Sequence, residues 1–238
     1  MDALTCTDVL CQREAFGLSI PSLCLRPGEK VALLGENGSG KTTLLQVLGG
    51  LLPCSGSVVC DGENLAELSA AQQAGLLGFL PQEAHVLFNI SVAELIDLSL
   101  EPGHLAPQAV RAEVLAATGM QNLLSRPVHT LSGGQMRRAM LARVCSRNAP
   151  YLLLDEPTAS LDIRHSVQFL NYLARAEKCV VASMHDITLA VLYFQRFLFL
   201  KDGVIVYDKQ RDELETQDFS DIFGLPFVRH GSFFLPGV

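Results

Sequence analysis

An eight-residue segment rich in glycine constrains the fold of this 238-residue chain more than any other feature. Gly35–Thr42 reads Gly-Glu-Asn-Gly-Ser-Gly-Lys-Thr and fits the pattern G-x-x-x-x-G-K-[ST]. The apolar run Val31–Leu34 before it predicts a buried strand, and leucines at helical spacing predict a helix over Thr43–Leu52. Strand, glycine loop and helix in this order favour a parallel α/β fold with an anion site at the loop.

The chemistry of this loop is that of phosphate binding. Glycines allow successive backbone N–H groups to turn toward an anion, and the following helix presents the positive end of its dipole. Lys41 is expected to reach the β- and γ-phosphates of a nucleotide, while the Thr42 hydroxyl binds Mg²⁺. The expected nucleotide-binding residues are Gly35, Glu36, Asn37, Gly38, Ser39, Gly40, Lys41, Thr42 and Thr43. The sequence contains no Asn-Lys-x-Asp motif, which a GTPase usually carries.

Two acidic residues follow a second apolar run. Tyr151–Leu154 predicts a buried strand that ends at Asp155 and Glu156. Because an unpaired buried charge is costly, acids at such a position need a partner. Asp155 suits the surroundings of Mg²⁺, and Glu156 suits the polarisation of an attacking water. The alternative is an exposed acidic loop that caps the next helix.

A second candidate anion site contains no lysine. Leu131–Gln135 reads Leu-Ser-Gly-Gly-Gln and precedes a helix predicted from near Met136 to Arg147. Such a site cannot hold a nucleotide alone, but it can contact the γ-phosphate of a nucleotide held elsewhere. Taken in isolation, the same pattern also suits an ordinary capped turn.

The remaining pattern predicts alternating strands and helices around one helical lobe. Ser91–Glu94 matches a capping box at the start of that lobe. We expect one domain over 1–238, with a core formed by 1–81 and 148–238 and a helical subdomain over 82–147. Further strands are predicted at Val58–Cys60, Cys179–Ser183, Arg196–Leu200 and Val204–Tyr207.

Composition excludes several classes of protein. The 18 basic and 25 acidic residues give a net charge of −7, which argues against a nucleic-acid partner. Apolar residues reach 49%, yet no run of 18 predicts a membrane-spanning helix, and the first residues do not resemble a secretory signal. The cysteines are odd in number and form no C-x-x-C pair, which favours free thiols in a reducing compartment. They are Cys6, Cys11, Cys24, Cys54, Cys60, Cys145 and Cys179.

Taken together, these motifs resemble those of the nucleotide-binding subunits of ABC transporters. Their order and spacing fit over about residues 5–210. The resemblance implies an α/β P-loop NTPase of the ABC type, with a RecA-like core, an inserted helical subdomain and an N-terminal antiparallel β region. The matching segments are the Walker A loop Gly35–Thr42, Gln82 of the Q-loop, the signature Leu131–Gln135, the Walker B end Asp155–Glu156, the D-loop Ser160–Asp162 and the switch His185.

The resemblance also implies roles for these residues. It implies an ATPase that works as a head-to-tail homodimer, with each ATP between one subunit's loop and the other's signature. Glu156, His185 and Gln82 are the implied catalytic residues, and an aromatic such as Phe16 stacks on adenine, although plain core packing also suits Phe16. The implied metal residues are Thr42, Gln82 and Asp155, and the implied contacts across the dimer are Ser132, Gly133, Gly134, Gln135 and Asp162.

A cassette without fused spans implies separate partners. These are an integral-membrane permease and a substrate-binding protein, which place the cassette peripherally on the cytoplasmic face of the inner membrane. A groove for a coupling helix is expected from Phe88, Ile90, Val92, Leu95 and Ile96, or these residues pack inside the helical subdomain.

The expected cargo rests on a looser resemblance. Leu68–Ala70, Gly78–Gln82 and the end Ile222–Phe227 are similar to importers of iron siderophores, haem and vitamin B12. A zinc or manganese importer is the alternative within transport. A soluble ABC ATPase, such as an iron–sulfur assembly factor, and a nucleotide-dependent scaffold without turnover remain alternatives of other classes. The role of residues 218–238 is open.

Overall fold

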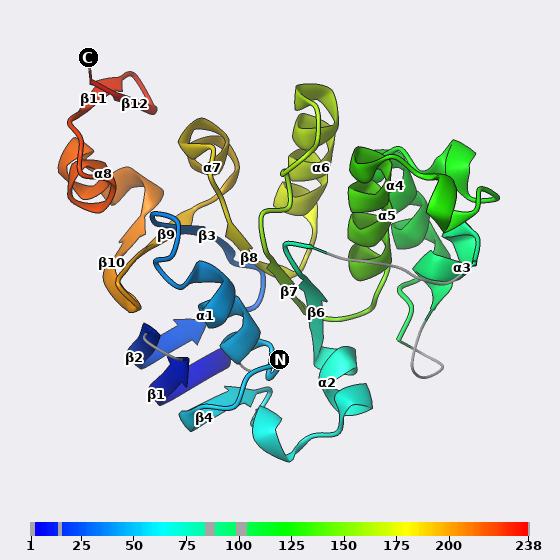
Figure 1. Cartoon of the computed structure of the whole chain (residues 1–238), viewed down its shortest axis with the longest axis horizontal. Helices are drawn as coiled ribbons and strands as arrows, with labels where there is room; N and C mark the ends of the chain where they lie inside the picture. Colours follow the sequence, from blue (N-terminus) through cyan, green and yellow to red (C-terminus); the bar gives the residue numbers. More distant parts are fainter. Residues whose placement is uncertain (1–2, 14–15, 84–88, 99–103, 238) are drawn as a thin grey trace.

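A mixed β-sheet forms the centre of the molecule in a computed structural model that describes residues 3–13, 16–83, 89–98 and 104–237 (Figure 1). Within these residues the strand order is β5-β4-β1-β2-β10-β9-β3-β8-β7-β6. A separate antiparallel pair, β11 (Phe227–His230) and β12 (Phe233–Pro236), lies at the C-terminal end. The strands of the large sheet are β1 (Leu4–Arg13), β2 (Phe16–Leu25), β3 (Lys30–Leu34), β4 (Ser55–Cys60), β5 (Glu63–Asn64), β6 (Leu77–Leu80), β7 (Tyr151–Leu154), β8 (Cys179–Ser183), β9 (Arg196–Lys201) and β10 (Val204–Gln210).

The sheet has a parallel and an antiparallel part. β3 pairs in parallel with β8 and β9, and β7 pairs in parallel with β8 and β6. All five residues of β3 and of β8 are buried, which is typical of parallel strands covered on both faces. β1 pairs antiparallel with β2 on one side and with β4 on the other. The predicted α/β core with an N-terminal antiparallel region is confirmed.

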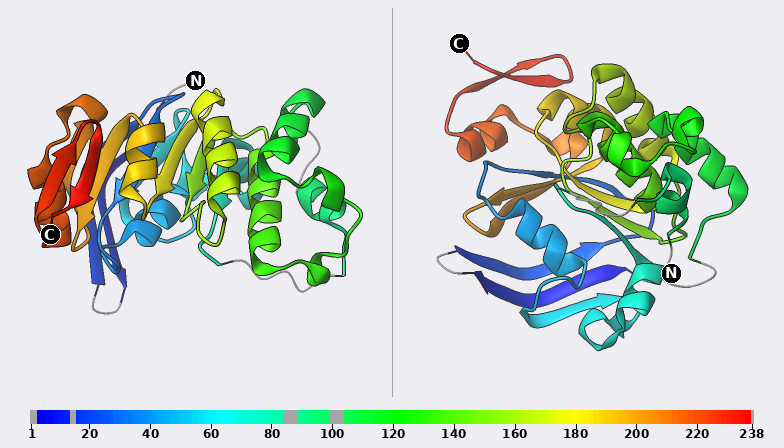
Figure 2. Two further views of the ribbon diagram at one scale, coloured as in Figure 1. Left: turned by 90° about the horizontal axis from the view of Figure 1, so that it is seen from above. Right: turned by 45° about the vertical axis from the view of Figure 1, so that its right-hand side comes forward.

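Helices cover both faces of the parallel strands. Alternate residues of β3 point to opposite faces, with Ala32 and Leu34 in one apolar cluster and Val31 and Leu33 in the other. α5, α6 and α7 lie on the first face, while α1 lies between the parallel strands and the antiparallel part (Figures 1 and 2). The helices are α1 (Lys41–Leu48), α2 (Ala70–Leu76), α3 (Val92–Asp97), α4 (Gln108–Thr118), α5 (Gly133–Cys145), α6 (Ile163–Arg175), α7 (Ile187–Tyr193) and α8 (Thr216–Phe223).

The helical stretch between β6 and β7 contains α3, α4 and α5. The capping box predicted at Ser91 is present, because Ser91 Oγ accepts from the Glu94 N–H and Glu94 Oε2 accepts from the Ser91 N–H. α5 begins at Gly133 and not near Met136, so the predicted start was three residues late. The reason is that Ser132 caps this helix through its own side chain.

The apolar residues of α3 do not form the predicted docking groove. Val92, Leu95 and Ile96 are at most 3% exposed and pack in the core, which is the alternative that the sequence left open. Ile90 is half-buried against the same cluster, and Phe88 lies outside the described residues.

No helix in the described part of the chain is long and apolar enough to cross a membrane. The seven cysteines are free.

Candidate nucleotide site

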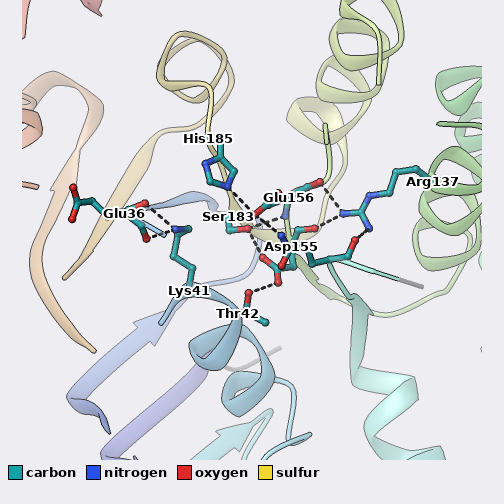
Figure 3. A network of polar contacts seen from close by, with 10 residues as sticks. Glu36, Lys41, Thr42, Arg137, Asp155, Glu156, Ser183 and His185 are labelled. Carbon is teal, nitrogen blue, oxygen red and sulfur yellow. Dashed lines mark hydrogen bonds and ion pairs between the residues drawn. The ribbon is translucent and has the colours of Figure 1, made fainter. Parts of the chain in front are cut away.

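Four strands bring the predicted site residues together at one edge of the sheet. β3, β6, β7 and β8 are parallel neighbours, so their carboxyl ends meet there (Figure 3). A cleft of about 680 Å³ opens at this edge. The residues that line it are Arg13, Phe16, Asn37, Gly38, Gly40, Lys41, Thr42, Thr43, Gln82, Glu156 and His185.

The glycine loop wraps around the Lys41 ammonium. Lys41 Nζ donates to the carbonyl oxygens of Gly35 and Glu36 at 2.8 Å each. Burial lowers the pKa of Lys41, while the nearby carboxylates of Glu156 and Asp155 oppose that shift. Among the described residues, the buried hydroxyl of Ser39 has no hydrogen-bond partner. A cationic loop with an unpaired hydroxyl fits a phosphate group.

Phe16 contacts this loop at Gly40. Gly40 caps α1 with a φ of 104°, a left-handed conformation that suits glycine. A Cβ atom at Gly40 would lie 2.5 Å from Phe16 Cζ, so the ring packs directly on the backbone of the loop. Phe16 therefore lies at the wall of the cleft, and its stacking on a base stays a prediction.

Asp155 is buried at the end of β7 with two hydroxyl partners. It is 1% exposed, and its Oδ2 and Oδ1 accept from Thr42 Oγ1 and Ser183 Oγ at 2.6 Å each. Hydroxyl and carboxylate oxygens are the donor set that Mg²⁺ prefers, so Thr42 and Asp155 fit such an ion. Ser183, which ends the buried strand β8, was assigned no role from the sequence. A hydroxyl residue at the end of an apolar strand could have indicated a buried polar contact there.

The Glu156 side chain contacts two other predicted site residues, Gln82 and His185. Its Oε1 lies 2.8 Å from His185 Nε2 and accepts from Gln82 Nε2 at 3.1 Å. The backbone of Glu156 has a φ of 48°, which is strained for a residue with a side chain. Its N–H donates to Ser183 Oγ at 2.8 Å. The structure thus brings Gln82 and His185 each into contact with Glu156.

Arg137 is a further residue of this region that the sequence did not indicate. It comes from α5, is 8% exposed, and reaches the ends of β6 and β7 (Figure 3). Its guanidinium donates to the carbonyl oxygens of Pro81, Gln82, Asp155 and Glu156. No sequence motif pairs an arginine with backbone carbonyls so far away in the chain.

The remaining predicted residues lie outside the cleft of their own chain. Among the described residues, those that line the cleft do not include Ser132–Gln135 or Asp162. Ser132 and Gln135 cap α5 reciprocally, at 3.3 and 3.0 Å. Asp162 caps α6 and accepts from the His165 backbone N–H, and its carboxylate lies 2.8 Å from His165 Nδ1. Contacts of these residues across a dimer stay a prediction.

The fold and the loop define a P-loop nucleotide-binding protein, and comparison with known proteins narrows that class. The chain belongs to the ABC transporter family, whose model matches residues 18–159. It is 38% identical over 189 residues to a cobalamin import ATP-binding protein of Halobacterium salinarum, covering 75% of this chain and 48% of that protein. The chain thus spans about half the length of that relative.

Two further relatives cover more of both sequences. A hemin import ATP-binding protein of Myxococcus xanthus is 38% identical, covering 85% of this chain and 82% of that protein. A petrobactin import ATP-binding protein of Bacillus anthracis is 33% identical, with coverages of 89% and 83%. Among solved structures, a dimeric ATP-binding cassette with ADP and phosphate superposes with a TM-score of 0.73 at 25% identity, covering 87% of this chain and 98% of that one.

Proposed function

We propose that the chain binds and hydrolyses ATP to energise import through a separate membrane permease. The observation that carries the proposal is the contact of Gln82 and His185 with Glu156, beside a lysine-containing phosphate loop. The relatives described above are named as import ATP-binding proteins, which supports import.

Each residue of the site has a separate role in ATP hydrolysis. The loop and Lys41 bind the phosphates, and the Phe16 ring stacks on the base. Glu156 accepts the proton of the attacking water, while His185 and Gln82 hold its carboxylate in place. Thr42 and Asp155, with Gln82, would hold Mg²⁺, which would neutralise charge on the phosphates.

The proposed assembly is a homodimer of cassettes on a permease. Ser132–Gln135 and Asp162 lie outside their own cleft, which leaves them available to the nucleotide of a second copy. The dimeric state of the superposed cassette supports this arrangement. We place the dimer at the cytoplasmic face of the membrane, with a substrate-binding protein on the other side. The cargo is a metal chelate, such as an iron siderophore or haem, or cobalamin.

Two measurements test this proposal. Glu156→Gln is expected to abolish ATP hydrolysis while ATP-driven dimerisation is preserved, because the amide keeps the shape but not the basicity. Unchanged turnover would refute Glu156 as the base. Purification of the tagged chain from gently solubilised membranes is expected to recover a polytopic membrane protein. Recovery of soluble partners alone would overturn the importer and favour a soluble ABC ATPase.

A further inference from the structure

We propose that Arg137 is a positioning residue that fixes Glu156 and Gln82 relative to the Ser132–Gln135 segment on the same helix. Ser132–Gln135 of one chain contacts the nucleotide bound by a second copy. Arg137 transmits that contact along α5 and so sets the position of Glu156 in the cleft of the first chain. The inference rests on the proposed function, since it concerns ATP hydrolysis by a dimer.

Arg137 binds four backbone carbonyl oxygens at the ends of β6 and β7. Nη1 donates to Pro81 O at 2.6 Å and to Gln82 O at 3.0 Å, and Nη2 donates to Asp155 O and, at 2.8 Å, to Glu156 O. The planar fork of a guanidinium supplies these donors at fixed spacing, which a lysine ammonium cannot do. One side chain from α5 therefore joins the segments that follow β6 and β7.

The Arg137 cation is buried. Arg137 is 8% exposed, and burial lowers its pKa while the charges of Asp155 and Glu156 oppose the shift. A buried cation is unfavourable unless hydrogen bonds and nearby charges offset the loss of water. The hydrogen bonds of Arg137 offset its loss of water only while α5 stays packed against the ends of β6 and β7. A displacement of α5 therefore breaks these contacts together.

Arg137 also supports the strained backbone of Glu156. Its φ of 48° persists because both of its peptide groups are held: the N–H by Ser183 Oγ at 2.8 Å, and the C=O by Arg137 at 2.8 Å and by the Ala159 N–H at 3.0 Å. Arg137 also holds the carbonyl of Gln82, whose side chain contacts Glu156 Oε1. The position of the carboxylate therefore depends on Arg137.

The link to the second copy follows from the helix itself. Ser132 caps α5, and Arg137 lies five residues later, a rise of about 7.5 Å. Because a short helix moves as a unit, a shift of Ser132 is carried to the carbonyls of Gln82 and Glu156. ATP bound at one composite site thus adjusts the base of the other, which predicts positive cooperativity between the two sites.

Arg138 is a matched control on the same turn. Its Nη1 donates to Thr118 O and Gly119 O and lies 3.0 Å from His165 Nε2. None of its contacts within the described residues reaches the ends of β6 and β7. Arg138→Lys therefore perturbs α5 without releasing Glu156.

The experiment compares Arg137→Lys, Arg137→Gln and Arg138→Lys with the wild-type full chain. Nucleotide titration gives the ATP Kd and the fraction of active sites, and steady-state assays give kcat per active site and the Hill coefficient. For both Arg137 variants we expect kcat to fall about 10²-fold with the ATP Kd nearly unchanged. The Hill coefficient is expected to exceed 1 for the wild type and to fall toward 1 for both variants, because the sites no longer communicate.

Two results would overturn the proposal. One is a kcat per active site for Arg137→Lys within about threefold of wild type, with an unchanged Hill coefficient. The other is an equal loss in Arg138→Lys, which would show that the loss is not specific to the contacts of Arg137 with the ends of β6 and β7. A wild-type chain that neither binds nor hydrolyses ATP would instead refute the proposed function, so the two failures are distinguishable.

Discussion

Ser183→Ala is the substitution from which the structure predicts a large effect at a residue outside the nucleotide-binding motifs. Ser183 is fully buried at the end of β8. Its hydroxyl donates to Asp155 Oδ1 at 2.6 Å and accepts from the Glu156 N–H at 2.8 Å. Alanine removes one oxygen atom and both contacts.

The magnitude follows from the two hydrogen bonds. The bond to the Asp155 carboxylate is worth about 1.5–3 kcal/mol, and the neutral bond to Glu156 about 0.5–1.5 kcal/mol. Because the strained N–H of Glu156 then lacks its buried partner, we expect a loss of about 2–4 kcal/mol in the free energy of unfolding. For a chain of this length the melting temperature falls by roughly 5–15 °C. kcat is expected to fall about 10²-fold as Glu156 loses its position.

Urea unfolding and steady-state ATP hydrolysis, both on the purified chain, measure these two effects. Ser220→Ala is the matched control, since Ser220 Oγ also donates to a carbonyl, Thr216 O, and accepts from a backbone N–H, Phe227. It lies on α8, away from the cleft, and is expected to lose about 1–2 kcal/mol with no change in kcat. A stability loss for Ser183→Ala below about 0.5 kcal/mol, or an unchanged kcat, would refute the reasoning.

Three further predictions concern the rest of the structure. Gly40→Ala is expected to weaken ATP binding at least about tenfold, measured by titration, because its Cβ would overlap the Phe16 ring and its φ is left-handed. Burial raises the pKa of the Cys145 thiol to about 12, so at pH 8.5 it stays protonated and should react with thiol reagents only on unfolding, unlike the partly exposed cysteines. Hydrogen bonds from His165 lower the pKa of Asp162, so its contribution to stability is present above the ordinary carboxyl pKa and is lost as pH falls through the lowered one. Asp162→Ala should therefore destabilise the chain in urea at pH 7, and by progressively less as the pH falls below the ordinary carboxyl pKa.

Sequence patterns predicted the local parts of the fold and site well. The strand before Gly35–Thr42, the helix after it and the acids after β7 follow from patterns within about ten residues. Such patterns determine local geometry directly, because glycine conformations and strand periodicity are local properties. The fold class and family drawn from them are confirmed by the topology and the family match.

The features that were missed depend on tertiary placement. Arg137 reads in sequence as a polar residue of a helix, and only the packing of α5 brings it to the ends of β6 and β7. Val92, Leu95 and Ile96 have the apolarity of a docking groove or of a core, and periodicity alone cannot separate the two. The start of α5 was predicted late because the Ser132 side chain extends the helix by capping it.

The pairing of β3 has a consequence for how the chain is synthesised. Lys30 of β3 pairs with Val180 of β8, and Val31 pairs with Arg196 of β9, so both neighbours of β3 are translated at least 150 residues later. At about 5–20 residues per second, the ribosome needs roughly 8–30 s to produce them. During that interval both edges of an apolar strand are without their native partners, which exposes the nascent chain to aggregation. The phosphate loop after β3 is therefore made early but becomes rigid late.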